Sequence, residues 1–207
     1  MLLASVLLIA EAALLAFGGL WWWPLSALAM APVILLGRAT VLGGPLDPVS
    51  LRSGIRGEER VAAVLAELEP EGYEALHDLD TGHGNADHVL VGPTGVFVIE
   101  TKDWGGRFYR NGGRLMFNDK PADQVVGQVT AAALAVRGLL EDAGIEVWVQ
   151  AVVASTRAKV STGQMRLGHV TVAEADRLPD LVRGARGSMD AETAARAISA
   201  ILGDHAA

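Results

Sequence analysis

The fold of this chain is decided by residues 87–102, which read DHVLVGPTGVFVIETK. The runs on either side of the Gly-Pro-Thr-Gly step at 92–95 are rich in β-branched and other apolar residues, and the step itself has the composition of a tight turn. This pattern predicts a β-hairpin. Asp87 would lie on its first strand, and the second strand would carry Glu100 and Lys102.

The spacing of these three side chains suggests a chemistry. Side chains two positions apart in a strand share a face, so we expect Glu100 and Lys102 to point toward whatever Asp87 also faces. Two carboxylates and an ammonium group at a sheet edge can hold a hard divalent cation and orient a water molecule, as metal-dependent phosphodiester hydrolysis requires. A solvated strand face would have the same spacing. The position of Glu100 directly after the apolar run 96–99 favours a functional carboxylate.

Composition excludes several other classes of site. The 207-residue chain has no cysteine, which excludes disulfides, thiolate metal sites and a cysteine nucleophile. Its formal net charge of −7 predicts no general attraction to nucleic acid. Contact with nucleic acid would therefore need a local basic patch, for which residues 101–120 and 155–170 are candidates, although scattered surface charge would look the same.

The first 38 residues are predicted to be a membrane anchor, because Glu11 is the one formally charged side chain before Arg38. One interpretation is a helical hairpin with arms at 2–17 and 21–37. Each arm is short for a hydrocarbon core about 30 Å thick, which needs about 20 residues. The other interpretation is a single span at about 12–36.

Flanking residues bear on this choice. Three consecutive tryptophans, Trp21 to Trp23, suit a membrane interface and favour the hairpin. A cleaved signal peptide is a third possibility, but no basic residue precedes the apolar run. Arg38, Arg52 and Arg56 follow it, which predicts that the following domain is on the cytoplasmic side of the cell membrane.

Periodicity and breakers predict a linker at 39–53 and then an α/β or α+β fold, with a mixed central sheet and flanking helices. The expected helices are 57–69, 122–142, 173–183 and 190–202, and the expected strands are 73–79, the two hairpin strands, 107–110, 114–117, 147–154 and 169–172.

Three segments together carry a family resemblance: 54–58, 84–102 and 121–124. With these residues the chain resembles the nuclease-related domain (NERD), which is assigned to the PD-(D/E)xK nuclease-like superfamily, over about residues 52–155. The resemblance implies a restriction-endonuclease-like core within a NERD domain at 54–172. Residues 173–207 would form C-terminal helices that pack on it. Family members are often bacterial and often tethered to membrane segments.

The resemblance also implies roles for five residues. Asp87 and Glu100 would be metal ligands, with Glu58 from the first helix as an auxiliary acid near the metal. Lys102 would stabilise charge on the scissile phosphate or orient the attacking water, and Gln124 would complete the cleft. The cofactor would be Mg²⁺ or Mn²⁺.

The implied function is Mg²⁺-dependent hydrolysis of DNA or RNA by a membrane-tethered domain. The alternative is a module that keeps the nuclease fold and binds nucleic acid or protein without turnover. Two other features are a stretch rich in histidine and aspartate, which offers a possible transition-metal site, and Trp104, which would either rim a nucleic-acid groove by stacking or pack in the core. The members of that stretch are His77, Asp78, Asp80, His83 and His88.

Overall fold

The computed structural model describes residues 48–81 and 85–203. The predicted anchor at 1–38 lies outside these residues and stays a prediction. Within the two described ranges, no helix is both long and apolar enough to cross a membrane.

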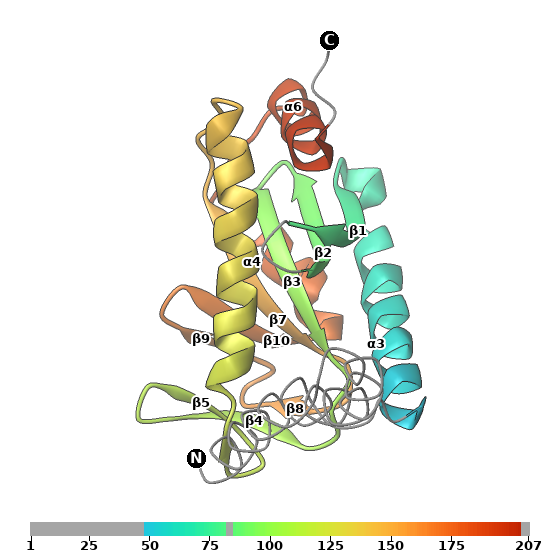
Figure 1. Ribbon diagram of the computed structural model, residues 1–207, viewed down its shortest axis with the longest axis vertical. Helices are drawn as coiled ribbons and strands as arrows, with labels where there is room; N and C mark the ends of the chain where they lie inside the picture. Colours follow the sequence, from blue (N-terminus) through green and yellow to red (C-terminus); the bar gives the residue numbers. More distant parts are fainter. Residues whose placement is uncertain (1–47, 82–84, 204–207) are drawn as a thin grey trace, which may run out of the picture. The chain divides into compact units, whose positions relative to one another are not determined.

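A mixed sheet forms the centre of the described part (Figure 1). Its strands are β1 (Glu74–Asp80), β2 (Asn85–Gly92), β3 (Gly95–Lys102), β7 (Val149–Ser155), β9 (Gln164–Leu167) and β10 (Val170–Glu174). Their order across the sheet is β1-β2-β3-β7-β10-β9. β1, β2 and β3 form an antiparallel meander, β7 and β10 run parallel to β3, and β9 closes the edge antiparallel to β10.

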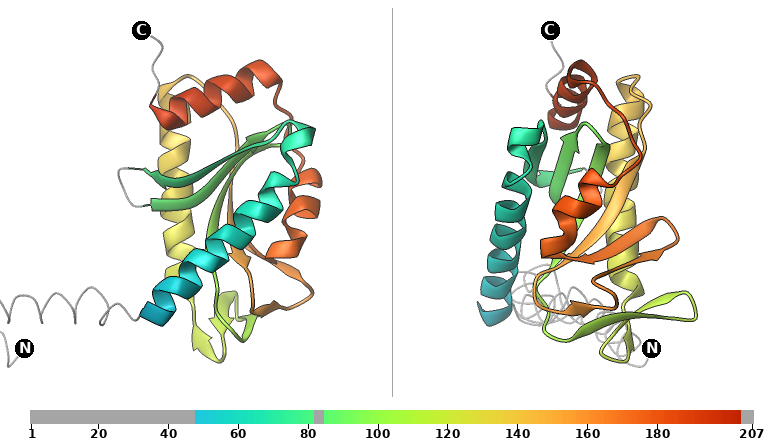
Figure 2. Two further views of the ribbon diagram at one scale, coloured as in Figure 1. Left: turned by 90° about the vertical axis from the view of Figure 1, so that its right-hand side faces the viewer. Right: turned by 180° about the vertical axis from the view of Figure 1, so that it is seen from behind.

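Helices cover both faces of this sheet. They are α3 (Pro48–Ala66), α4 (Asp123–Asp142), α5 (Leu178–Arg183) and α6 (Ala191–Leu202), with short 3-10 turns at Glu69–Glu71 and Ala175–Arg177. α4 and α6 pack on one face, where Val125 and Val129 contact a buried cluster that includes Val98. α3 and α5 pack on the other face (Figure 2). There Leu65 and Phe97 are fully buried. A mixed α/β fold with a mixed sheet between helices is therefore confirmed.

A second, smaller sheet lies at one end of the first. It consists of β4 (Arg107–Asn111), β5 (Arg114–Phe117), β6 (Lys120–Pro121) and β8 (Lys159–Val160), in the order β6-β5-β4-β8. The predicted strands at 107–110 and 114–117 are thus confirmed as a hairpin. The two-residue strands β6 and β8 were not predicted, because so short a segment shows no hydrophobic periodicity.

The predicted hairpin at 87–102 is also confirmed. β2 and β3 pair from His88 opposite Ile99 to Gly92 opposite Gly95, with the turn at Pro93 and Thr94. The ring of Tyr73 lies against Gly92 where a β-carbon would otherwise be. Gly92 therefore allows the strand before the hairpin to pack closely against its turn.

Two predicted helix boundaries are wrong. α3 begins at Pro48, well before Gly57, so the end of the predicted linker, 48–53, is helical. Asp47-Pro48 has the composition of a chain breaker, but proline also suits the first turn of a helix, where its missing N–H is not needed. The predicted helix at 173–183 is in fact the end of β10, a 3-10 turn and the short helix α5.

Candidate active site

The β2–β3 hairpin brings Asp87 to the end of β3. Asp87 lies near the start of β2, and its Oδ2 accepts a hydrogen bond of 2.7 Å from the backbone N–H of Thr101. Glu100 and Lys102 flank Thr101 on β3. Since β3 runs antiparallel to β2, the beginning of one strand lies beside the end of the other. The local pairing therefore assembles the three residues that the sequence singled out.

Glu100 and Lys102 form an ion pair on their shared strand. Nζ of Lys102 donates to Oε1 of Glu100 at 2.6 Å. The Glu100 side chain is almost fully buried, at 3% exposure, and that of Lys102 is 16% exposed. The expectation that these two side chains lie on the same side of β3 is correct.

Burial perturbs both carboxyl groups, and a neighbouring acidic charge adds to its effect on each. The pKa of Glu100 is raised, first by burial and then by the charge of Asp87, and the ammonium of Lys102 opposes this. The pKa of Asp87 is also raised by burial, while the Thr101 N–H and Lys102 act to lower it. In the absence of a bound cation, ionising both groups is therefore unfavourable relative to carboxyl groups in water.

Glu58 reaches the same region from α3. Its pKa is raised by partial burial and by the charges of Asp87 and Asp78, and Lys102 lowers it. α3 approaches the end of β3 closely at Gly57, where a β-carbon would be 2.8 Å from Cβ of Asp103. Glycine thus allows the helix to bring the next residue, Glu58, near the strand.

Asp78 is an acidic neighbour whose place in this group the sequence did not predict. It lies on β1 with a left-handed backbone, φ 51°, and Asn85 Nδ2 donates to its Oδ1. Its charge raises the pKa of both Glu58 and Asp87. The signal in the sequence is an acidic residue near the end of the predicted strand 73–79, and the possible transition-metal stretch contains the same residue.

In the stretch rich in histidine and aspartate, where the sequence offered a possible transition-metal site, two histidines contact each other. Nδ1 of His77 and Nδ1 of His88 are 2.8 Å apart, so one ring donates to the other. His88 is buried, and burial together with His77 lowers its pKa to about 4. His83 lies outside the described residues. The two histidines pair with each other in β1 and β2.

Gln124 is the second residue of α4 and is exposed. The start of α4 lies toward the same end of the sheet as the end of β3 (Figure 1). Within the described part of the chain, Gln124 has no hydrogen bond to Glu58, Asp87, Glu100 or Lys102. The structure therefore joins four of the five predicted residues, Glu58, Asp87, Glu100 and Lys102, through direct contacts or charge.

The carboxylate oxygens of this site are suitable ligands for a hard divalent cation, but they are not already arranged around a metal position. Carboxylate oxygens are the ligands that Mg²⁺ prefers. Burial and then repulsion from neighbouring carboxylates raise the pKa of Glu58, Asp87 and Glu100, and a bound cation would relieve that repulsion. Among residues 48–81 and 85–203, however, no three or more histidine or acidic side chains are grouped closely enough to hold a metal ion. One oxygen of Glu100 is engaged by Lys102.

Comparison with known proteins identifies the family of this part of the chain. The model of the family described as "Nuclease-related domain" matches residues 53–156, about half of the chain. An uncharacterized protein of Bacillus anthracis is 39% identical over 61 residues, which cover 27% of this chain and 29% of that protein. No solved structure matches. Because the family model covers half of the chain, including the hairpin, the part of α3 that carries Glu58 and the start of α4, the chain belongs to the nuclease-related domain family.

Proposed function

We propose that this protein is a metal-dependent nuclease that hydrolyses phosphodiester bonds of DNA or RNA. One observation carries the proposal: Glu58, Asp87 and Glu100, from three separate elements, all have a raised pKa beside a single lysine, and the charge of Asp87 contributes to the raised pKa of both glutamates. A surface charge pattern without function would not be expected to bury two like charges next to each other. Membership of the nuclease-related domain family supports the same chemistry.

Asp87 and Glu100 would hold Mg²⁺ or Mn²⁺, with Glu58 as an auxiliary ligand. When bound, the cation polarises the phosphate and makes hydroxide available near neutral pH. The Lys102 ammonium would stabilise the negative charge that develops on the phosphate, or would orient the water. The water would give up a proton to solvent as its oxygen bonds to phosphorus, and the ester P–O bond would break with its electron pair on the departing oxygen, which would take a proton from solvent. Gln124 would line the cleft from α4.

Two broader assignments belong to the same proposal. The sheet with its hairpin, α3 and α4 would be a restriction-endonuclease-like core of the PD-(D/E)xK superfamily. Residues 1–38, which carry one acidic residue ahead of Arg38, would tether this domain to the cell membrane with its site in the cytoplasm. Fractionation of cells that express the full chain checks the tether, since the protein should sediment with membranes.

A cleavage assay tests the enzyme proposal. The full chain, solubilised in detergent, is incubated with plasmid DNA and with RNA in the presence of Mg²⁺, Mn²⁺ or EDTA. Cleavage should require the cation and should be lost in Glu100→Gln, while Glu146→Gln, a change in an exposed glutamate outside the site, should cleave normally. Equal cleavage by both variants would refute the proposed roles. Binding without any cleavage would support the alternative, a non-catalytic binding module.

A further inference from the structure

A shallow pocket of about 440 Å³ lies next to the carboxylate site. Its walls come from the connection between β3 and β4, from β5 and from the loop between β7 and β8. The lining residues are Asp103, Trp104, Gly105, Phe117 and Arg157. The carboxylate chemistry proposed above uses none of these side chains.

The core holds the ring of Trp104 in place. It stacks on Phe108, with ring centroids 6.0 Å apart and planes 25° apart, and it meets Phe117 at 4.9 Å. Phe108 is fully buried, whereas Trp104 is 38% exposed. The ring is therefore a fixed aromatic surface that remains partly open to solvent.

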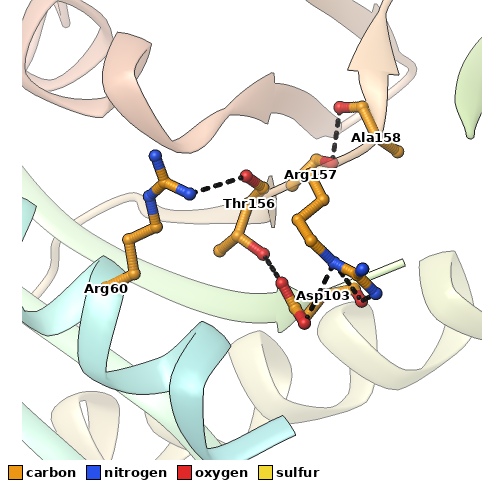
Figure 3. A network of polar contacts seen from close by, with 6 residues as sticks. Arg60, Asp103, Thr156, Arg157 and Ala158 are labelled. Atoms are coloured by element: carbon orange, nitrogen blue, oxygen red, sulfur yellow. Dashed lines mark hydrogen bonds and ion pairs between the residues drawn. The ribbon is translucent and has the colours of Figure 1, made fainter. Parts of the chain in front are cut away.

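Arg157 is also held in place, by the residue before Trp104. Its Nη2 donates to the carbonyl oxygen of Asp103 at 2.6 Å, and its Nε lies 3.1 Å from Oδ2 of Asp103 (Figure 3). The hydroxyl of Thr156 donates to the other carboxylate oxygen. The arginine side chain nevertheless stays 54% exposed. A guanidinium plane and an indole ring thus border one pocket, and the Asp103 carboxylate is already engaged.

Lys102 connects this pocket with the carboxylate site. Its Nζ donates to Glu100 at 2.6 Å and lies 5.7 Å from the centroid of the Trp104 ring. A phosphate held at Lys102 would therefore have the pocket as its immediate neighbour. Along a nucleic-acid strand, the group next to a phosphate is a nucleoside.

We propose that the Trp104 pocket binds an unpaired nucleobase, so that the substrate is a single-stranded nucleic acid or an unpaired end. This inference rests on the proposed function, because it assumes that a phosphodiester occupies the carboxylate site. Aromatic rings and arginine planes stack on unpaired bases of any sequence. A base within a duplex presents no free face to such a pocket. Both oxygens of the Asp103 carboxylate are engaged, by Arg157 and Thr156, so this carboxylate is not expected to select a particular base. The pocket should therefore accept any base.

Binding in the absence of turnover tests this inference separately from catalysis. Fluorescence anisotropy is measured with the full chain in EDTA, on a labelled oligo(dT) of about 16 nucleotides, a hairpin duplex and an abasic oligomer of similar length. Oligo(dT) should bind more tightly than both controls. Trp104→Ala should weaken its binding about 5- to 150-fold, the range for the loss of one stacked base. Trp104→Phe should restore most of it.

Two further variants guard against a general loss of structure. Gly105 lines the pocket and a β-carbon there would meet no atom within 4 Å, so Gly105→Leu should block the pocket without disturbing its neighbours. Trp148 is a matched control, because it is 60% exposed and lines a different pocket. Trp148→Ala should leave oligo(dT) binding unchanged.

The outcomes separate the inference from the proposed activity. Loss of oligo(dT) binding in Trp104→Ala and Gly105→Leu, with unchanged binding of the abasic oligomer, supports the base pocket even if no cleavage is ever seen. If both variants bind oligo(dT) like wild type, or if wild type binds the duplex as tightly as the single strand, the inference is wrong. Both outcomes carry the same meaning whether or not the protein cleaves.

Discussion

Lys102 donates from Nζ to Oε1 of Glu100 at 2.6 Å, two positions apart on β3. The pair places one positive charge beside a buried carboxylate. Burial and then the charge of Asp87 raise the pKa of that carboxylate. The same ammonium lies 5.7 Å from the Trp104 ring centroid. Lys102 therefore borders both the carboxylate site and the neighbouring pocket, and its removal should affect catalysis more than any surface cation.

Lys102→Met should reduce the rate of Mg²⁺-dependent cleavage about 100- to 1,000-fold, the cost of removing one group that stabilises transition-state charge. It should also raise the pKa of Glu100, because the cation that lowers it is gone. Single-turnover cleavage across pH measures both effects. Lys159→Met removes an exposed lysine paired with Glu174 and serves as the control. Equal rates for the two variants would contradict the role of Lys102.

Asp87→Asn should stabilise the metal-free protein and abolish its stabilisation by Mn²⁺. Burial raises the pKa of Asp87, so its ionised form costs stability at neutral pH, and that cost grows as pH rises through the native pKa. An asparagine oxygen can still accept from Thr101. In wild type, Mn²⁺ at 100 times its Kd should add about 2.7 kcal/mol to the free energy of unfolding.

Thermal melts with and without Mn²⁺ measure this effect, with Asp142→Asn as the control because Asp142 is exposed at the end of α4. The control should keep the full metal response. If Asp87→Asn also kept it, Asp87 would not be a ligand.

The hairpin could be predicted because its signals are local. The turn residues at 92–95 and the apolar runs beside them lie within one short segment, and the pairing of β2 with β3 follows from them. Glu58 was found by family resemblance, since nothing in α3 alone indicates that it faces β3. The start of α3 was missed because a proline can either end or begin a helix.

Features that depend on distant pairing could not be predicted. Asp78 joins the acidic group only because β1 pairs with β2 and because its backbone is left-handed at that point. The Trp104 pocket needs Phe117 from β5 and Arg157 from the loop after β7. The spacing of side chains along the chain carries no information about contacts between residues on different elements.

Asp78→Asn should weaken Mn²⁺ binding about 3- to 10-fold, because one unit charge several ångströms away contributes about 1 kcal/mol in a water-like medium. The left-handed backbone tolerates asparagine, so the fold should be unchanged. Isothermal titration with Mn²⁺ measures the affinity. A loss as large as that in Asp87→Asn would make Asp78 a direct ligand, and no loss would remove it from the site.

His88 should make the protein sensitive to acid. Its pKa is lowered from 6.5 to about 4, so the unfolded chain takes up a proton before the native state does. The free energy of unfolding should therefore fall by about 3 kcal/mol as pH decreases from 6.5 to 4. The raised pKa values of Asp87 and Glu100 act in the opposite direction, since their native carboxyls protonate more readily.

Urea unfolding at several pH values separates these contributions. In His88→Gln the decline between pH 6.5 and 4 should become much smaller. The slope that remains should come from the carboxyl groups, because the raised pKa values of Asp87 and Glu100 oppose the decline and the lowered pKa values of Glu174 and Asp190 add to it. His169→Gln, at an exposed histidine, should retain the decline. An unchanged pH dependence in His88→Gln would show that His88 is not the group responsible.

Gly92→Ala should destabilise the fold by about 1–3 kcal/mol, the usual cost of overpacking a core. Its β-carbon would overlap the ring of Tyr73, which is 6% exposed and whose hydroxyl hydrogen-bonds to Oγ1 of Thr94 at 2.9 Å. Gly138→Ala in α4 is the matched control, because a β-carbon there meets no atom within 4 Å and alanine favours a helix by about 1 kcal/mol. The midpoint of urea unfolding should therefore decrease in Gly92→Ala and increase in Gly138→Ala. If the Tyr73 ring is the cause, Gly92→Ala should cost little in a Tyr73→Ala background, and an undiminished cost there would assign the effect to the hairpin backbone instead.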